Sequence, residues 1–236
     1  MVITLRRTHK ENYNIQTFWF KPEKSLTYNP GQFIEMYLPH NNPDERGIKR
    51  WFTLSSSPSE KLISITTKFF GNEASTFKKQ LFSLKPGDEV KIVEPMGDFV
   101  LPKDKNKPLV FVAGGIGITP FHSMAKWLVD TGEKRKITVL LAANTAKDFI
   151  FVDLFHRTGA KVIQMVSVPS TNWLGLVGQL SSRKILALTG NPGDKLLYVS
   201  GPEPMVETLE TQLVSNGVSK DQLVLDFFPG YRSDLK

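Results

Sequence analysis

The sequence predicts a two-domain protein, in which an N-terminal antiparallel β-barrel is followed by a C-terminal α/β domain with a parallel sheet. Three observations lead to this prediction. Up to about residue 104, short strand-like segments alternate with turns, whereas beyond it near-continuous apolar runs alternate with helical patterns. A glycine-rich turn at residues 114–117 marks the first strand-to-helix connection of the second half. We therefore expect domains at residues 1–104 and 105–236, with Lys103–Lys107 as the linker.

The first half is rich in Ile, Val, Phe, Trp and Thr, which favour strands. Turn sequences such as Asn29-Pro30-Gly31 and Lys85-Pro86-Gly87-Asp88 separate the strand-like segments, and this spacing is typical of an antiparallel barrel or sandwich. One stretch, Ala74–Leu84, has a helical pattern. The expected strands lie within residues 3–7, 14–20, 32–38, 50–56, 62–70 and 88–95.

The second half has apolar runs that suit parallel strands covered on both faces. They occupy residues 108–114, 136–143, 160–168 and 195–200. Helical patterns lie between or after them, at Phe121–Val129, Asp148–His156 and Pro204–Ser215. This alternation of strand and helix predicts a doubly wound sheet.

Composition excludes several classes of protein. The chain has no cysteine, so disulfides, thiolate zinc sites and cysteine-bound iron–sulfur clusters are excluded, and its four histidines have no metal-ligand spacing. The net charge of +7 is dispersed among acidic residues, so we expect no nucleic acid partner. The sequence contains no apolar run long enough to cross a membrane and no signal-peptide pattern at its start, and we expect a cytoplasmic protein.

The turn at residues 114–120 has the composition of a phosphate-binding loop. Gly114, Gly115 and Gly117 allow positive φ and close approach of the backbone, and Thr119 and Pro120 suit the N-cap and first position of a helix. The free N–H groups of a helix N-terminus favour a pyrophosphate. The alternative is a tight turn that needs glycine for packing alone. The turn differs from the usual dinucleotide fingerprint, because the third glycine is Pro120 and the second strand runs into the uncharged Asn144.

Four motifs, in the correct order, resemble those of the ferredoxin–NADP⁺ reductase superfamily. The nicotinamide-nucleotide turn of that family resembles Val112–Pro120, and its Arg-x-Tyr-Ser flavin motif resembles Arg50–Ser56. Its Cys-Gly-Pro motif resembles Tyr198–Pro202, with Met205 following, and its flavin phosphate segment resembles Gly71–Thr76. The resemblance covers nearly the whole chain, including the order of barrel and α/β domain.

The resemblance implies that the first domain binds FAD. Arg50 would clamp the pyrophosphate. Ser75 and Thr76, at the start of the predicted helix Ala74–Leu84, would add their hydroxyl and N–H groups. Phe52 stands at the position of the stacking tyrosine and Thr53 at that of the serine near flavin N5. Alternatively, Arg50 forms a surface ion pair, and Trp51 and Phe52 belong to the barrel core, where strand alternation points one of the two inward. The remaining residues expected near the flavin are Trp51, Thr66, Lys68 and Ala74.

The resemblance also implies that NAD(P)H docks over Gly115–Pro120 and passes a hydride to the flavin, with Thr53, Ser200 and Asp226 as the catalytic residues. Ser200 replaces the family's cysteine, and Asp226 and Phe227 stand in the closing segment Leu225–Tyr231. A last strand with core aromatics is an equal alternative for that segment. Uncharged residues follow the second and third strands, which predicts a preference for NADH. The other residues expected at the nucleotide are Gly114, Asn144, Gly201, Pro202 and Met205.

The expected activity is therefore that of an FAD-dependent NAD(P)H reductase that delivers electrons to a separate redox protein. The positive net charge favours an acidic carrier such as a ferredoxin or flavodoxin, with Lys103–Lys107 or Lys78 and Lys79 as its docking patch. Two alternatives stay open: a flavin or ferric reductase that uses small acceptors, and a non-catalytic flavin-binding subunit for electron transfer.

Overall fold

The computed structural model describes residues 1–228 and divides the chain between Leu101 and Pro102 into two compact units. This division falls just before the predicted boundary of residues 104 and 105. Lys103–Lys107 belongs to the second unit, where Arg135 donates a hydrogen bond to the carbonyl of Asp104 and Lys105 forms an ion pair with Glu133. No helix within the described residues is long and apolar enough to span a membrane.

The first unit is a six-stranded antiparallel sheet with the order β4-β3-β6-β1-β2-β5. The amide of Ser55, just after β4, donates to the carbonyl of Ser64 in β5 at 2.8 Å, so hydrogen bonding joins the two edges of the sheet as the barrel prediction requires. The elements are β1 (Val2–Lys10), β2 (Ile15–Pro22), β3 (Phe33–Tyr37), β4 (Lys49–Thr53), β5 (Ile63–Lys68), a 3₁₀ turn η1 (Gly71–Glu73), α1 (Thr76–Ser83) and β6 (Glu89–Ile92).

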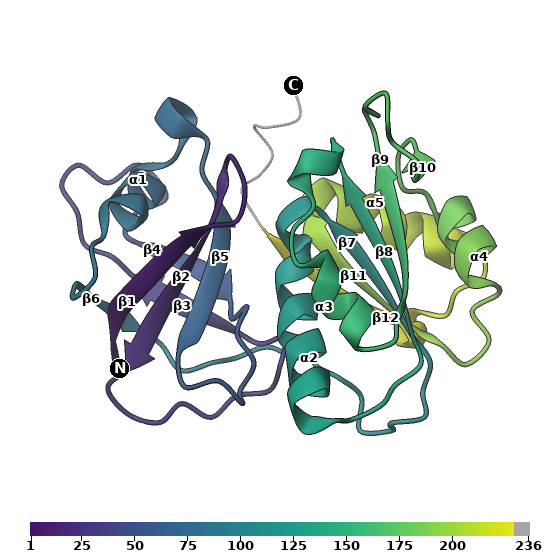
Figure 1. Cartoon of the computed structure of the whole chain (residues 1–236), viewed down its shortest axis with the longest axis horizontal. Helices are drawn as coiled ribbons and strands as arrows, with labels where there is room; N and C mark the ends of the chain where they lie inside the picture. The colour runs from purple at the N-terminus through teal and green to yellow at the C-terminus, as the bar shows by residue number, and fades with distance from the viewer. Residues whose placement is uncertain (229–236) are drawn as a thin grey trace. The chain divides into compact units, whose positions relative to one another are not determined.

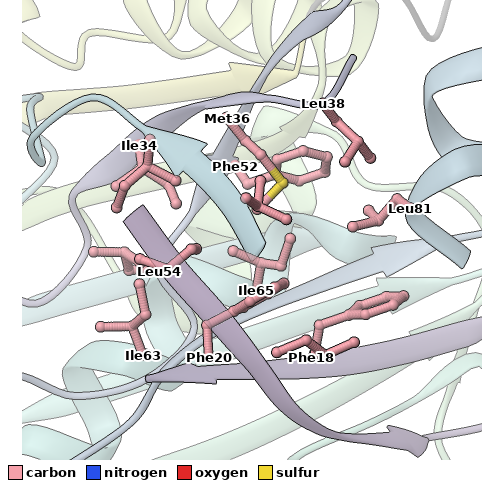
Figure 2. Packing of buried hydrophobic residues seen from close by; sticks show 14 of the residues in the cluster. Phe18, Phe20, Ile34, Met36, Leu38, Phe52, Leu54, Ile63, Ile65 and Leu81 are labelled. Atoms are coloured by element: carbon pink, nitrogen blue, oxygen red, sulfur yellow. The ribbon is translucent and has the colours of Figure 1, made fainter. Parts of the chain in front are cut away.

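Alternation along the strands builds the core of this unit. Phe18 and Phe20 in β2 and Ile63 and Ile65 in β5 point to the same interior, and Leu81 from α1 closes over it (Figure 2). Residues two apart on a strand share a face, so the residues between them point outward. This placement determines which polar side chains of β2, β4 and β5 are available on the outer face.

The second unit is a parallel sheet with the order β10-β9-β8-β7-β11-β12, and helices α2 and α3 lie on the face opposite α5 (Figure 1). Six buried residues make up β7, as expected for the first and central strand. The elements are β7 (Leu109–Gly114), η2 (Gly115–Gly117), α2 (Ile118–Thr131), β8 (Ile137–Ala143), η3 (Ala146–Asp148), α3 (Val152–Arg157), β9 (Lys161–Val166), β10 (Leu176–Val177), α4 (Ser182–Thr189), β11 (Leu196–Pro202), α5 (Glu203–Ser215), η4 (Lys220–Gln222) and β12 (Leu223–Phe228).

The fold class is confirmed, and two elements were missed. Helix α4 begins after Ser181, whose hydroxyl accepts a hydrogen bond from the amide of Lys184, and ends at Gly190 with a φ of +76°. Both signals are visible in the sequence as a serine cap and a terminating glycine. Strand β10 has only two residues, both exposed, and carries no apolar pattern that would predict it.

Candidate functional site

The glycine turn after β7 forms one 3₁₀ turn that runs directly into α2, with Gly117 at the N-cap. The prediction of Thr119 as N-cap and Pro120 as first helical residue was wrong, because the helix begins at Ile118. The hydroxyl of Thr119 donates to the carbonyl of Ile116 at 3.1 Å, inside the helix start. The helix starts earlier because Gly115–Gly117 already has helical curvature.

The three glycines have two different physical reasons. Gly115 adopts a φ of +54°, which β-branched and bulky residues avoid. Gly114 and Gly117 have ordinary φ values, but a Cβ atom on Gly114 would overlap Met205, and one on Gly117 would overlap the backbone of Ser200. Packing within the unit is therefore enough to explain why Gly114 and Gly117 are glycines, whether or not the turn binds phosphate.

This turn lies where strand order reverses. The chain proceeds from β7 to β8 on one side, and later returns to place β11 on the other side, so the carboxyl ends of β7 and β11 flank the switch point of the sheet. In open α/β sheets, ligands bind outside the carboxyl ends of the strands at such a point. A small pocket opens at the carboxyl ends of β7 and β8, lined by Ala113, Gly115, Ile118, Leu141, Ala142, Ala143, Asp148, Phe149 and Ile150.

Ser200 and Asp226 form a hydrogen-bonded pair at the same edge of the sheet. They are register partners on the adjacent parallel strands β11 and β12, and the Ser200 hydroxyl donates to Oδ2 of Asp226 at 3.2 Å. Burial raises the pKa of Asp226 to about 6, against the lowering effect of the Ser200 hydrogen bond. Asp226 can therefore hold or release a proton near neutral pH, as a group that takes part in proton transfer requires.

The remaining predicted nucleotide residues lie around this edge. Gly201 is buried, and a Cβ atom there would overlap Met205, so that methionine packs against both Gly201 and Gly114. Pro202 ends β11, and Asn144 is exposed just after β8. Phe227 is 48% exposed, which does not fit a core aromatic. Pro229–Tyr231 of the expected closing segment lies outside the described residues.

In the first unit, Arg50 is held by its own loop. Its Nη1 donates to the carbonyls of Arg46, Gly47 and Lys49, and its Nη2 forms an ion pair with Asp44 at 3.1 Å. No described residue accepts a hydrogen bond from its Nε. The guanidinium also lies 5.2 Å from the centre of the Phe77 ring. Arg50 is therefore fixed and partly buried, and its ion pair is not a mobile surface contact.

The N-terminus of α1 adjoins Arg50 through Asp44. Ser75 is the N-cap and accepts from the amide of Lys78, while Asp44 Oδ2 accepts from the amide of Thr76 at 2.9 Å. The Thr76 hydroxyl accepts from the amide of Asp44 and lies 2.9 Å from Nε2 of His40. The sequence reasoning missed Asp44 and His40, because the loop that carries Asp44 is far from α1 in the sequence.

The aromatic pair Trp51 and Phe52 divides between the two faces of β4. Phe52 is buried in the barrel core, with its ring 5.9 Å from that of Phe77, whereas Trp51 is 58% exposed. Thr53 shares the face of Trp51 and is buried. The stacking role of Phe52 stays a prediction, and Trp51 is the ring of this pair that a ligand can reach.

Thr66 belongs to a chain of buried hydroxyls on the outer face of the sheet. Its Oγ1 lies 2.9 Å from both Thr17 Oγ1 and Ser55 Oγ, and Thr17 in turn donates to Glu11 at 2.6 Å. Lys68 follows at the end of β5 and is partly exposed. Thr17 and Ser55 were not predicted, because cross-strand neighbours become visible only when the register is known.

The donors present fit the two expected groups by their chemistry. A guanidinium beside a helix N-terminus favours a phosphate, and Arg50 retains N–H groups on Nε and Nη2 for it. A glycine turn at the switch point favours a dinucleotide. Arg50, Ser75 and Thr76 would hold the flavin pyrophosphate, and Gly115–Pro120 the nicotinamide nucleotide.

Comparison with known proteins agrees with this arrangement. The family model of the oxidoreductase NAD-binding domain matches residues 111–211. Flavohemoprotein A of Dictyostelium discoideum is 27% identical over 94% of this chain and 58% of its own length. The glycine betaine monooxygenase reductase subunit of Chromohalobacter salexigens is 26% identical over 96% of this chain and 64% of its own length. The chain thus spans about three fifths of the length of these curated relatives.

A solved structure shows the same fold. A ferredoxin NADP⁺ reductase from Neisseria gonorrhoeae with bound FAD and NADP superposes with a TM-score of 0.80 at 16% identity, over 96% of this chain and 98% of that chain. An antiparallel six-stranded unit followed by a parallel NAD-binding unit defines the class of NAD(P)H-dependent flavin oxidoreductase modules. The chain has the fold of a ferredoxin NADP⁺ reductase, and residues 111–211 match the oxidoreductase NAD-binding domain, in agreement with the resemblance of its motifs.

Proposed function

We propose that this module binds FAD in its first unit, takes a hydride from NADH bound to its second unit, and passes electrons to a separate acidic redox protein. The observation that carries the proposal is the joint placement of the glycine turn and the Ser200–Asp226 pair at one edge of the sheet. Flavin, when bound, accepts two electrons together and releases them singly. The residues supply binding, orientation and a proton store.

Asp226 is the group that we assign to proton storage. Because burial raises its pKa to about 6, its carboxyl group can gain or lose a proton near neutral pH. Ser200 orients this carboxylate from the neighbouring strand. Thr53 and the exposed Trp51 would face the flavin, and Phe227 the nicotinamide side.

The preference for NADH is supported by the uncharged rim of the nucleotide site. Asn144 is the exposed residue after β8. The cations that could reach a 2′-phosphate are Lys147, Arg183 and Lys184, and the ammonium group of Lys184 donates to the carbonyl of Gln179 at 3.1 Å. A 2′-phosphate usually needs an arginine or lysine directed at it. We therefore expect a higher kcat/KM for NADH than for NADPH, and a clear advantage for NADPH would contradict this.

The proposal of a protein acceptor is supported by the relatives and by charge. The relative from Chromohalobacter salexigens is named as a reductase subunit of a monooxygenase, so it works beside another component. The net charge of +7 favours an acidic partner. Lys79 is exposed on α1 and Lys78 lies beside it, so both can contribute to docking. Lys105 is already paired with Glu133, which makes Lys103–Lys107 the weaker candidate.

The test has three stages. The purified chain should be yellow and release FAD on acid extraction, and it should reduce ferricyanide with NADH. Reduction of acidic ferredoxins and flavodoxins should be faster at low salt, and replacing Lys78 and Lys79 by Glu should remove that salt dependence. If only ferricyanide and free flavin are reduced, the chain is a flavin or ferric reductase. If flavin binds and NADH oxidation is absent, the chain is a non-catalytic electron-transfer subunit.

A further inference from the structure

The loop between β3 and β4 places a carboxylate on the donors that a flavin phosphate would need. This loop, residues 41–47, carries Asp44 to the first turn of α1 and to the guanidinium of Arg50. We propose that Asp44 is an internal anion that occupies the phosphate position in the flavin-free protein, and that the loop must release α1 and Arg50 when FAD binds. The inference rests on the proposed binding of FAD.

Asp44 contacts the first residue of α1 through both its side chain and its backbone. Oδ2 accepts from the Thr76 amide at 2.9 Å, and Oδ1 accepts from Arg50 Nη2 and from the Arg46 amide, each at 3.1 Å. The backbone amide of Asp44 donates to the Thr76 hydroxyl at 2.9 Å. One acidic residue thus engages both groups of Thr76 and one side of the guanidinium.

A phosphate and Asp44 cannot use these donors at the same time. A backbone N–H carries one hydrogen, so the amide of Thr76 serves either the carboxylate or a phosphate oxygen. A carboxylate that stays beside a bound pyrophosphate also repels it, and this repulsion is strong where both charges are partly screened from water. Release of Asp44 would remove both conflicts. It would also leave the guanidinium of Arg50 without a carboxylate partner, so that its positive charge could pair with the phosphate.

The loop has the features that such a movement needs. Asn42 and Gly47 bracket Asp44 in left-handed conformations, with φ of +50° and +68°. No atom lies within 4 Å of the position that a Cβ would take at Gly47. Asn41–Pro43, Glu45 and Arg46 are all exposed, so few packing contacts resist the movement. The carbonyl of Lys49, which belongs to β4, can still hold Arg50 after Asp44 leaves.

The test compares Asp44→Asn with Glu45→Gln in the full-length flavin-free protein. Asn keeps an oxygen acceptor for the Thr76 amide and removes the charge, whereas Glu45 is the exposed neighbour in the same loop and gives the same change in net charge. FAD binding is followed by stopped-flow fluorescence and by titration, and thermal unfolding of the flavin-free forms reports on folding.

We expect Asp44→Asn to bind FAD roughly 3- to 30-fold more tightly and faster, because no charge-assisted hydrogen bonds must be broken first. Its flavin-free form should unfold at a lower temperature than the wild type, and Glu45→Gln should behave like the wild type in both measurements. Weaker FAD binding by Asp44→Asn would overturn the inference and make Asp44 a residue that positions Arg50 for the phosphate. Equal effects of the two variants would also overturn it.

A second measurement needs no variant. Hydrogen exchange of the backbone amides in residues 41–47 should become faster when FAD is added to the wild type, because the loop is released. Slower exchange on FAD binding would contradict release. If the wild type binds neither FAD nor FMN, the proposed function fails together with this inference. If it binds FAD and the loop stays closed, only the inference fails.

Discussion

The two candidate binding regions of this chain are built from different kinds of contact. The glycine turn of the second unit is fixed by backbone overlap, since Gly117 packs directly on the backbone of Ser200. The Arg50 region of the first unit is fixed by charge, since Asp44 joins the guanidinium to α1. Steric contacts of the first kind tolerate almost no change, whereas charged contacts of the second kind can exchange one anion for another.

The largest effect should follow from Gly117→Ala. The added Cβ would overlap the carbonyl of Ser200 and the amide of Gly201, and backbone atoms of a central strand cannot move away without disturbing the sheet. We expect a loss of at least about 3 kcal/mol in the free energy of unfolding, measured by urea denaturation. The control is Gly159→Ala, where φ is +80° and no atom lies nearby, so that only backbone strain is introduced. We expect about 1 kcal/mol there. Equal losses of stability in the two variants would contradict the claim that close backbone contact fixes the glycine turn.

Arg50→Ala tests the region built from charge. The variant removes the cation expected to hold the pyrophosphate, and it leaves the Asp44 carboxylate on α1 without its ion-pair partner. We expect FAD binding to weaken by about 1.5–3 kcal/mol, measured by fluorescence titration, with a smaller effect on the folding of the apoprotein. Lys49→Ala is the matched control. It also removes one cation from β4, but the Lys49 side chain is more exposed, and its Nζ lies 3.9 Å from Oε2 of Glu35. Unchanged FAD affinity in Arg50→Ala would show that the guanidinium has only a structural role.

Asp226→Asn tests whether burial sets the pKa of the carboxyl group at the carboxyl ends of β11 and β12. The folded-state pKa of Asp226 is about 6, above the usual value of 3.8, so the folded protein holds the proton more tightly than the unfolded chain. The contribution of the protonated Asp226 carboxyl group to the free energy of unfolding is complete below about pH 4 and is lost as pH rises through 6. We expect the variant to be about 1–2 kcal/mol more stable than the wild type at pH 8, with no advantage at pH 4. An advantage that is independent of pH would contradict the assigned pKa.

The smallest expected effect is that of Ser200→Ala. The Ser200 hydroxyl lowers the pKa of Asp226 by donating to its carboxylate, so removing it should raise that pKa further. The pH at which stability declines should move upward by roughly one unit, a cost on the order of 1 kcal/mol at pH 8. Infrared titration of the carboxyl group measures the shift directly. Ser200→Thr, which keeps the hydroxyl, is the control, and an unchanged midpoint in Ser200→Ala would mean that the hydrogen bond does not influence the proton.

Local pattern predicted most of the fold. Alternation and turn residues predicted the six strands of the first unit, and continuous apolar runs predicted β7, β8, β9 and β11. Prediction from local pattern failed where the signal for an element was weak or was assigned to the wrong residue. Thr119 and Pro120 have the right chemistry for a helix start, yet the preceding glycines already curve into the helix, so α2 begins earlier than the cap signal indicates.

The candidate site shows the same division. The positions of the glycine turn, Arg50 and Ser200 follow from motifs, because each motif is a short run of residues with a recognisable chemistry. Asp44 could not be assigned from sequence, because its partner Thr76 lies in another element and the loop shows no pattern that directs it there. The opposite faces of Trp51 and Phe52 were foreseen as alternation, but which of the two points inward depended on the core around Phe77.

The sequence by itself determined the class of protein, the order of its two units and the residues able to bind phosphate or carry a proton. Periodicity and turn chemistry act over a few residues, so they are readable along the chain. Only the tertiary structure decided that Gly114 and Gly117 are needed for packing, that Ser200 meets Asp226, and that Asp44 occupies the donors of α1. Those outcomes depend on strand register and loop path, which set the distances between residues that the sequence keeps far apart.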